Sequence, residues 1–352
     1  MAKRVLLGMS GGVDSSVSAV LLKEQGYEVI GVTMKLWEGE IEGSCCNLSS
    51  TMDAKSVCNF LSIPHYTLNF KDTFHKYIIQ DFVQCYQAGK TPNPCIACNR
   101  YLKFGKMFQM AQELQCDFVA TGHYAKTEFD QERNCFVLKK ANALAKDQSY
   151  VLYNIPKEKL GQVIFPLGEF ETKQKVREMA EKRGLPVAKK PDSEDICFVP
   201  DGDYVRFSEK EANIQPETGE IVNQKGEVLG EHQGLYRYTI GQRKGLGITS
   251  KVPLYVLRLE QEKNRLVVGE EKELYQKECV VLDVNWLLPK IERKPQEWMV
   301  KIRYSKQEKL AKVCPTQFGA IVQFQEPQKA ITPGQSAVFY QGDVIVGGGI
   351  IQ

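Results

Sequence analysis

The amino-acid sequence predicts an α/β protein: a domain built on a parallel sheet, followed by a small central domain and a C-terminal antiparallel β-barrel. Two observations support this class. Over the first two hundred residues, short β-rich runs alternate with amphipathic segments of helical spacing, as in a parallel sheet with helices on both faces. After about residue 200, glycines and charged turns separate short alternating apolar runs, which suits antiparallel strands.

The first domain is expected to span residues 1–205. Its predicted strands are residues 4–8, 27–34, 65–70 and 117–124, and its predicted helices are residues 16–26, 52–62 and 101–115. A further helix is expected from Glu171, and Gly184 and Pro186 should end it. The central domain is expected at 206–275 and the barrel at 276–352, with β-rich runs at 280–287, 297–305, 311–324 and 336–351.

Composition narrows the class of protein. No run approaches the roughly 18 apolar residues that a membrane span needs, and the first residues lack a signal-peptide cleavage site. We therefore expect a cytoplasmic location. The 11 cysteines are odd in number and scattered, which argues against a secreted disulfide framework. Residues 276–352 carry 10 basic and 7 acidic side chains and so hold the whole net charge of +3, a weak sign of a polyanion-facing surface.

The stretch GMSGGVDSS, residues 8–16, stands between the first predicted strand and the first predicted helix. Such a bend attracts anions, because the first N–H groups of a helix are unpaired and the helix dipole favours negative charge there. Gly11 and Gly12 permit close approach of a phosphate. Ser10, Ser15 and Ser16 offer hydroxyl donors, and Asp14 offers a carboxylate suited to Mg²⁺. The alternative, a simple helix cap, explains one polar residue but not the cluster.

A second informative stretch is GKTPNPCIACNRYLKFG, residues 89–105. Two prolines around Asn93 stiffen the approach to a helix on which Cys95 and Cys98 stand three apart. Cysteines at a helix start have lowered pKa values. A third candidate, Cys197, lies in KKPDSEDICFVPDGDY. Small buried side chains, a thioredoxin-like redox pair and a structural zinc site remain open alternatives for these cysteines.

The loop SGGVDSS resembles the pyrophosphate loop of the ATP-pyrophosphatase (PP-loop) superfamily, whose sheet is adenine-nucleotide-hydrolase-like. GMSGGVDSS, TPNPCIACNRYLKFG, ATGHYA, KDQSYVLY, DSEDICFVP and GLYRYTIGQRKGLGI occur in the order typical of the tRNA-specific 2-thiouridylases. This resemblance covers almost the entire chain. It implies an enzyme, a tRNA-uridine sulfurtransferase, that adenylates O2 of the wobble uridine with ATP and then replaces that oxygen by sulfur.

The resemblance also implies roles for single residues. The ATP-binding set would be Gly8, Met9, Ser10, Gly11, Gly12, Val13, Asp14, Ser15, Met34 and Gly122. Cys197 would carry the incoming persulfide sulfur, and Cys98 would release it through a disulfide. The tRNA-binding set would be Asn93, Pro94, Cys95, His123, Lys146, Asp147, Gln148, Arg303, Tyr304 and Gln335. The expected partners are tRNAs for Lys, Glu and Gln and a sulfur donor such as a cysteine desulfurase or relay protein.

Cys95 departs from the family, in which many members have Asp at this position. Cys95, Cys98 and Cys197 could together hold three irons of a four-iron, four-sulfur cluster, and Cys95 could also act in catalysis. Several other residues have a structural alternative to their functional role. His123 could be a core histidine, and Arg303 and Tyr304 could belong to an ordinary strand. Residues 234–248 could form a solvated hairpin instead of an RNA clamp.

Two rival functions remain at this stage. The first is a PP-loop synthetase that acts on a small molecule, which would leave the three cysteines and the basic C-terminal part without a use. The second is a non-catalytic RNA-binding or iron-sulfur protein, which would leave the serines and Asp14 of the loop without a use. Cys45 and Cys46 follow a polar loop and receive no role beyond accessory thiols.

Overall fold

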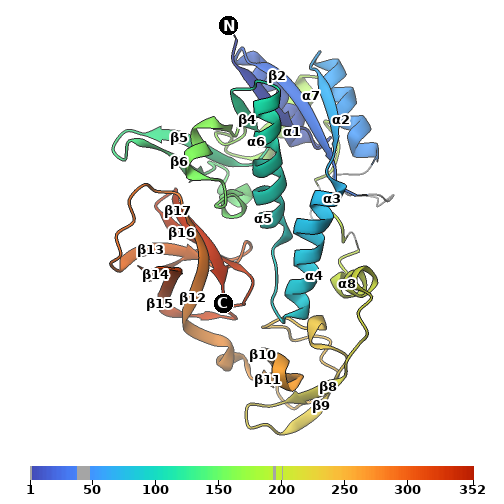
Figure 1. The fold of residues 1–352 in the computed structure, drawn as a ribbon, viewed down its shortest axis with the longest axis vertical. Coiled ribbons are helices and arrows are strands. Elements are labelled where there is room, and N and C mark those ends of the chain that lie inside the picture. Colours follow the sequence, from blue (N-terminus) through green and yellow to red (C-terminus); the bar gives the residue numbers. More distant parts are fainter. Residues whose placement is uncertain (1, 38–47, 193–195, 200) are drawn as a thin grey trace.

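The computed structural model describes residues 2–37, 48–192, 196–199 and 201–352, so Cys45 and Cys46 lie outside the described residues. The first domain contains a parallel sheet with the strand order β3-β2-β1-β4-β7 (Figure 1). Its strands are β1 (Arg4–Gly8), β2 (Glu28–Lys35), β3 (His65–Asn69), β4 (Phe118–Ala120) and β7 (Val163–Ile164). The order reverses between β1 and β4, and ligands of open α/β sheets bind at such a switch point.

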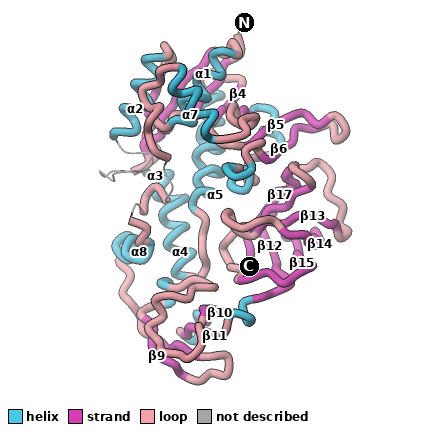
Figure 2. The backbone as a smooth tube through the Cα atoms, turned by 180° about the vertical axis from the view of Figure 1, so that it is seen from behind, coloured by secondary structure: helices cyan, strands magenta, loops and turns pink. Residues whose placement is uncertain are grey.

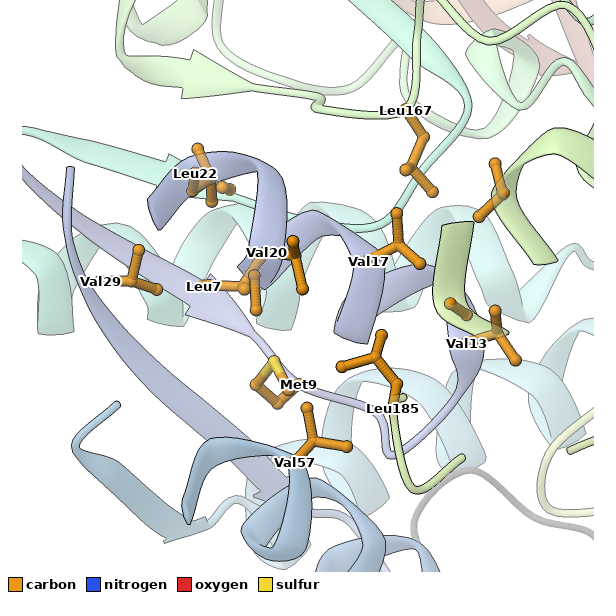
Figure 3. Packing of buried hydrophobic residues seen from close by; sticks show 14 of the residues in the cluster. Leu7, Met9, Val13, Val17, Val20, Leu22, Val29, Val57, Leu167 and Leu185 are labelled. Atoms are coloured by element: carbon orange, nitrogen blue, oxygen red, sulfur yellow. The ribbon is translucent and has the colours of Figure 1, made fainter. Parts of the chain in front are cut away.

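Helices cover both faces of this sheet, as the sequence predicts. One face carries α1 (Val13–Glu24), α2 (Leu48–Phe60) and α7 (Lys173–Lys182). Figure 3 shows their buried contact, in which Val17 and Val57 pack near Leu7 and Met9. The other face carries α6 (Met107–Glu113), whose Met107 packs against Leu6. Because β1 is covered on both sides, its central residues form a continuous apolar run.

A helical arm that the sequence analysis did not predict extends from the sheet. It consists of α3 (Lys71–Phe74), η1 (His75–Ile79) and α4 (Gln80–Gln87), and it lies beside α5 (Pro94–Cys98) and η2 (Asn99–Lys106) (Figures 1 and 2). The helix α8 (Tyr204–Ala212) packs on this arm, and Phe207 contacts the ring of Phe82. The expected boundary at residue 205 therefore falls inside a helix that packs on the first domain. The division at 205 and 275 stays a prediction.

The central part is a four-stranded sheet in the order β10-β11-β8-β9. Its strands are β8 (Gly219–Val222), β9 (Val228–His232), β10 (Tyr255–Glu260) and β11 (Arg265–Gly269). Short 3-10 helices link elements throughout the chain: η3 (Leu144–Lys146), η4 (Ser149–Val151), η5 (Lys157–Gln162), η6 (Leu235–Arg237), η7 (Gln261–Lys263) and η8 (Glu271–Leu274).

The carboxyl end forms an antiparallel barrel, as predicted. Its strands are β12 (Tyr275–Trp286), β13 (Gln296–Lys301), β14 (Lys309–Pro315), β15 (Gly319–Lys329), β16 (Ser336–Gln341) and β17 (Val344–Ile351). Pairing of β12 with β17 closes it. A hairpin of the first domain, β5 (Ala125–Asp130) and β6 (Cys135–Lys140), joins β17 at Lys139 and Val344. This extra hairpin ties the barrel to the first domain (Figure 2).

Within the described ranges, no helix combines the length and the apolar character that crossing a bilayer requires.

Candidate nucleotide and thiol site

The loop after β1 leaves the start of α1 open. Gly11 has φ +70°, and a Cβ there would lie 2.1 Å from the carbonyl oxygen of Ser50, so only glycine fits. Gly12 is the N-cap of α1, and it forms no side-chain capping bond. The first N–H groups of α1 therefore lack the usual side-chain acceptor, and the helix dipole makes this end favourable for an anion.

The serines of the loop mostly hold the loop itself. The Ser15 hydroxyl accepts a hydrogen bond from the Ser10 N–H at 3.2 Å and donates one to the Gly12 carbonyl at 3.2 Å. The Ser16 hydroxyl donates to the same carbonyl at 2.8 Å, and Ser16 has no exposed surface. Only Ser10 is exposed. The predicted hydroxyl donors therefore serve chiefly to rigidify the loop, and a bound phosphate would meet backbone N–H groups and Ser10.

Gly122, just beyond β4, closes directly on the start of α1. A Cβ at Gly122 would lie 2.8 Å from the Ser15 nitrogen and 2.9 Å from the Asp14 carbonyl carbon. Any side chain here would fill the space in front of the Ser15 N–H. The absence of a side chain at the switch point between β1 and β4 thus keeps a cradle open, and this cradle suits the phosphates of a nucleotide.

Asp14 has an unexpected partner. The Lys173 ammonium, from the first turn of α7, lies 2.5 Å from Oδ1 and 2.6 Å from Oδ2 of Asp14. The Tyr124 hydroxyl donates to Oδ1 at 2.8 Å, and burial together with the Asp14 charge raises the pKa of Tyr124. As arranged, Asp14 is already neutralised, so its carboxylate does not present the open oxygens that Mg²⁺ prefers.

Lys173 also contacts Asp192, with 3.1 Å between its Nζ and Oδ1. Arg177 binds the same carboxylate at 2.7 Å. Partial burial raises the pKa of Asp192, but the hydrogen bond from Lys173 and the surrounding cations outweigh this effect and lower it overall. Because Asp192 lies five residues before Cys197, Lys173 links the loop of residues 8–16 to the segment that leads to this cysteine.

The first two cysteines lie on α5, whose start is well defined. Pro94 occupies its first turn, and the Asn93 side chain accepts a hydrogen bond from the Ile96 N–H at 3.3 Å, a common N-cap arrangement. Cys95 is exposed and Cys98 is buried. Asn93 thus caps its own helix, and Pro94 is buried. Of this predicted tRNA-contacting group, Cys95 is the exposed residue.

Cys98 and Cys197 belong to the same apolar cluster. This cluster gathers Phe74, Phe82 and Phe198 around the buried Cys98, and the half-buried Cys197 packs against it. Met34, near the end of β2, is also half-buried against this cluster. The expected neighbour of adenine therefore contacts the same cluster as the two cysteines.

The predicted iron-sulfur ligands do not form a ready metal site. Among the residues that the structure describes, no group of three or more His, Cys, Asp or Glu side chains is arranged to hold a metal ion. Cys95, Cys98 and Cys197 are all described. In this conformation the three cysteines do not fit a cluster.

Comparisons with known proteins identify the family. Family models match residues 3–201 (tRNA methyl transferase HUP domain), 211–270 (tRNA methyl transferase PRC-barrel domain) and 276–351 (aminomethyltransferase beta-barrel domain). The tRNA-specific 2-thiouridylase MnmA of Acetivibrio thermocellus is 49% identical over 99% of this chain and 99% of its own. That of Clostridioides difficile is 48% identical over 100% and 99%. The chain belongs to the tRNA-specific 2-thiouridylase family.

Solved structures show weaker likenesses. The U34-tRNA thiolase NcsA from Methanococcus maripaludis, solved with its [4Fe-4S] cluster, is 23% identical with a TM-score of 0.35, over 59% of this chain and 67% of that one. A 4-thiouridine synthetase in complex with RNA and ATP is 18% identical with a TM-score of 0.37, over 60% and 50%. Likenesses this slight carry no argument about the site of the thiouridylase-family chain.

Two neighbouring residues expected to contact tRNA, the buried Asp147 and the half-buried Gln148, form hydrogen bonds within the protein in this member of the thiouridylase family. Asp147 is 8% exposed and accepts hydrogen bonds from the Ala141 N–H and from both the N–H and the hydroxyl of Ser149. Gln148 accepts a hydrogen bond from the Tyr124 N–H at 2.9 Å. These two side chains hold the segment that positions Tyr124 beside the loop of residues 8–16.

His123 is a core histidine in this structure. It is 8% exposed, and its Nδ1 lies 2.7 Å from the Thr121 hydroxyl. Burial, together with the nearby Lys103 charge, holds the pKa of His123 well below its usual value. The imidazole is therefore neutral at physiological pH. This geometry agrees with the alternative that His123 is a core histidine.

Two barrel residues expected to contact tRNA, Arg303 and Gln335, form hydrogen bonds to other segments of the protein. The Arg303 guanidinium donates to the Ala330 carbonyl at 3.0 Å and to the Thr332 hydroxyl. Gln335 donates to the carbonyls of Thr91 at 2.9 Å and Pro92 at 3.3 Å. Gln335 thus fastens the barrel to the segment that leads into α5.

Three members of the predicted tRNA-binding set are exposed. They are Cys95, Lys146 and Tyr304, the last with 45% of its surface exposed. In the loop at residues 234–248, Arg243 and Lys244 are exposed, whereas Arg237 pairs with Glu209 at 2.5 Å.

Sequence reasoning missed Lys173, Tyr124 and Asp192. Their local patterns indicate only a helix start, a strand end and a polar loop. No signal in a single sequence marks them, because Lys173 and Tyr124 meet Asp14, and Asp192 meets Lys173, only through tertiary folding.

Proposed function

We propose that this protein replaces O2 of the wobble uridine of a tRNA by sulfur, using ATP to activate that oxygen. The names of its full-length relatives, tRNA-specific 2-thiouridylases, support this assignment. The observation that carries it within the structure is the contact of Met34 with the cluster of Cys98 and Cys197. Met34, which we expect to contact adenine, thus packs against the same cluster as Cys98 and Cys197. This cluster lies at the carboxyl edge of the parallel sheet, where such folds bind ligands.

ATP would bind as a substrate at the loop of residues 8–15. Backbone N–H groups at the start of α1 would hold its phosphates, and Gly122 would leave room for them. The uridine O2 attacks the α-phosphorus, the bond to the bridging oxygen breaks, and pyrophosphate departs. The uridine oxygen then becomes part of AMP, a far better leaving group. Because Asp14 is paired with Lys173, we derive no step from a Mg²⁺ ion on this carboxylate.

Sulfur would arrive as a persulfide on Cys197, supplied by a donor such as a cysteine desulfurase or a relay protein. The terminal sulfur attacks C2 of the uridine, and the C2–O bond breaks as AMP leaves. The thiolate of Cys98 then attacks the Cys197 sulfur, breaks the S–S bond and frees the 2-thiouridine. A Cys98–Cys197 disulfide remains, and an external thiol reductant must restore both thiols. The common cluster of Cys98 and Cys197 supports this exchange.

A cluster mechanism is the second candidate, because Cys95 adds a third thiolate next to Cys98 in sequence. The described side chains form no assembled metal-binding group, which favours the persulfide route. An iron-sulfur route would need α5 or the Cys197 segment to rearrange, so we derive no step through a cluster.

The comparisons leave one disagreement about the transferred group. Two matched domain models have "methyl transferase" in their names, whereas the full-length relatives are named thiouridylases. Two cysteines in one cluster have a direct use in sulfur transfer and none in simple methylation. We therefore propose sulfur transfer to tRNA, and a cytoplasmic location stays a prediction.

The deciding experiment incubates unmodified tRNA with the protein, ATP, a desulfurase and cysteine, and then analyses the nucleosides by mass spectrometry. We expect 2-thiouridine at the wobble position, with none formed by Cys197→Ser. Cys135→Ser, a substitution at a half-buried cysteine on β6, should retain activity and serves as the matched control. A methylated nucleoside, or full activity in Cys197→Ser, would overturn the proposal. ATP-pyrophosphate exchange that ignores tRNA would favour a small-molecule synthetase.

A further inference from the structure

Lys301, the last residue of β13, has an unusual position between two tyrosines. Its ammonium nitrogen lies 5.8 Å from the ring centroid of Tyr150 and 5.5 Å from that of Tyr304. The two rings are 6.0 Å apart at their centroids and inclined by 54°. Such contacts attract a cation through the negative faces of the rings. They hold the side chain in place without neutralising its charge.

The charge of Lys301 is only partly compensated. Within the described part of the chain, no carboxylate lies within ion-pair distance of its ammonium. Asp147 is nearby but is satisfied by Ala141 and Ser149. Glu308 is bound by Lys140 at 2.5 Å. Burial lowers the pKa of Lys301 more than these two carboxylates raise it, and the Lys140 charge lowers it further.

Tyr304, which contacts Lys301, also lies near the start of α5. Tyr304 is exposed, and Cys95 is close enough that its charge helps to raise the pKa of Tyr304, after the effects of burial and of Asp147. Cys95 is itself exposed on α5. The half-buried ammonium of Lys301 and the exposed ring of Tyr304 therefore lie close to the start of α5, the helix that carries Cys95. A half-buried ammonium with no ion-pair partner gains most from an incoming anion, because its water shell is already reduced.

We propose that Lys301 and Tyr304 form a subsite for a phosphodiester of single-stranded RNA. In this subsite, Lys301 pairs with one phosphate of the anticodon loop while a neighbouring base stacks on Tyr304, so that the target uridine is presented at Cys95. This inference rests on the proposed function and assigns a positioning role to a residue outside the predicted tRNA-binding set. Cation-plus-aromatic pairs are the usual way in which proteins hold single-stranded RNA without reading its sequence.

The test measures tRNA affinity at several salt concentrations for the full chain and three variants. Lys301→Gln removes the charge, Lys301→Arg keeps it, and Lys277→Gln removes an exposed lysine from β12 as a control. For Lys301→Gln we expect tRNA affinity to fall about tenfold and the slope of log K against log salt to decrease by about 0.7, the value for one phosphate of a single strand. Lys301→Arg should retain the slope, and Lys277→Gln should match the unaltered chain.

ATP binding, measured by calorimetry, and the thermal unfolding midpoint show whether each variant is folded. If Lys301→Gln is folded and binds tRNA with unchanged affinity and salt slope, the subsite is refuted while tRNA thiolation stands. If the slope falls equally in Lys277→Gln, the effect is general electrostatics and the subsite is again refuted. If the unaltered chain binds ATP but no tRNA, the proposed function itself has failed.

Discussion

The ammonium of Lys173 bridges the two carboxylates of Asp14 and Asp192. Its Nζ lies 2.5 Å from Asp14 Oδ1 and 3.1 Å from Asp192 Oδ1. Asp14 belongs to the loop of residues 8–16, and Asp192 precedes the segment of Cys197. Lys173 is mostly buried, with 12% of its side chain exposed, so its charge is screened less than that of a surface lysine. A cation in this position is near enough to the loop to assist a bound triphosphate.

Replacing Lys173 should therefore weaken ATP binding. In Lys173→Met we expect the KM for ATP to rise about tenfold to a hundredfold, because a half-buried Asp14 loses its counter-charge, a loss of roughly 1.5–3 kcal/mol. The measurement is ATP-pyrophosphate exchange with tRNA present. Lys175→Met is the control. It removes an exposed lysine of α7 that pairs with Glu171, and it should leave the KM nearly unchanged. An unaltered KM in Lys173→Met contradicts the assignment.

Gln335 should affect tRNA thiolation by holding the segment that leads into α5. Gln335→Ala removes the hydrogen bonds to the carbonyls of Thr91 and Pro92, each worth about 1 kcal/mol. We expect faster hydrogen exchange in residues 90–98 and a severalfold lower rate of thiolation, with ATP affinity retained. Gln323→Ala, at an exposed glutamine bonded to Glu278, should change neither quantity. Unchanged exchange in Gln335→Ala would show that the barrel does not hold this segment.

His123 should make stability depend on pH in a definite direction. Its pKa lies well below 6.5 in the folded protein because of burial, so below about pH 6.5 the unfolded chain takes up a proton that the folded chain does not. The stability contributed by neutral His123 is thus fully present above pH 6.5 and is lost as pH falls. The slope is at most about 1.4 kcal/mol per pH unit.

Urea unfolding at several pH values tests this expectation. His65 and His232 also have lowered pKa values because of burial, so the informative quantity is the difference between the unaltered chain and His123→Gln. The variant should lose stability less steeply between pH 6.5 and 5. Parallel curves would mean that His123 takes up a proton as readily in the folded protein as in the unfolded chain.

Cys95 offers a test of the two sulfur mechanisms. Under the persulfide route, the anaerobically purified protein should be free of iron and sulfide, and Cys95→Ala should keep at least a third of the thiolation activity, while Cys98→Ala loses it. Iron and acid-labile sulfide assays, run beside the activity measurement, decide between the routes. About four irons per chain, lost together with activity in Cys95→Ala, would establish the cluster instead.

The strands and helices around the parallel sheet could be predicted because their signals are local. The apolar run before Gly8 and the glycines after it indicate a strand, a turn and a helix start within a dozen residues. The arm of α3, η1 and α4 was missed, since its middle forms π-helical turns and its apolar residues pack on α8 instead of the sheet. The strands β5 and β6 pair with each other locally, but the docking of this hairpin on β17 joins Lys139 to Val344, and no local pattern indicates a contact over two hundred residues.

The sequence by itself determined the class of fold, and it predicts an anion-binding loop at residues 8–15 and three cysteines for the site, since each of these depends on residues that are neighbours in the chain. The tertiary structure decided which residues come together: Lys173 and Asp14, Cys98 and Cys197 in one apolar cluster, and Lys301 between two tyrosines. It also decided that Lys146 and Tyr304 are exposed, whereas Asp147 and His123 are buried. Burial and ion pairing depend on distances between segments far apart in sequence, and only folding sets those distances.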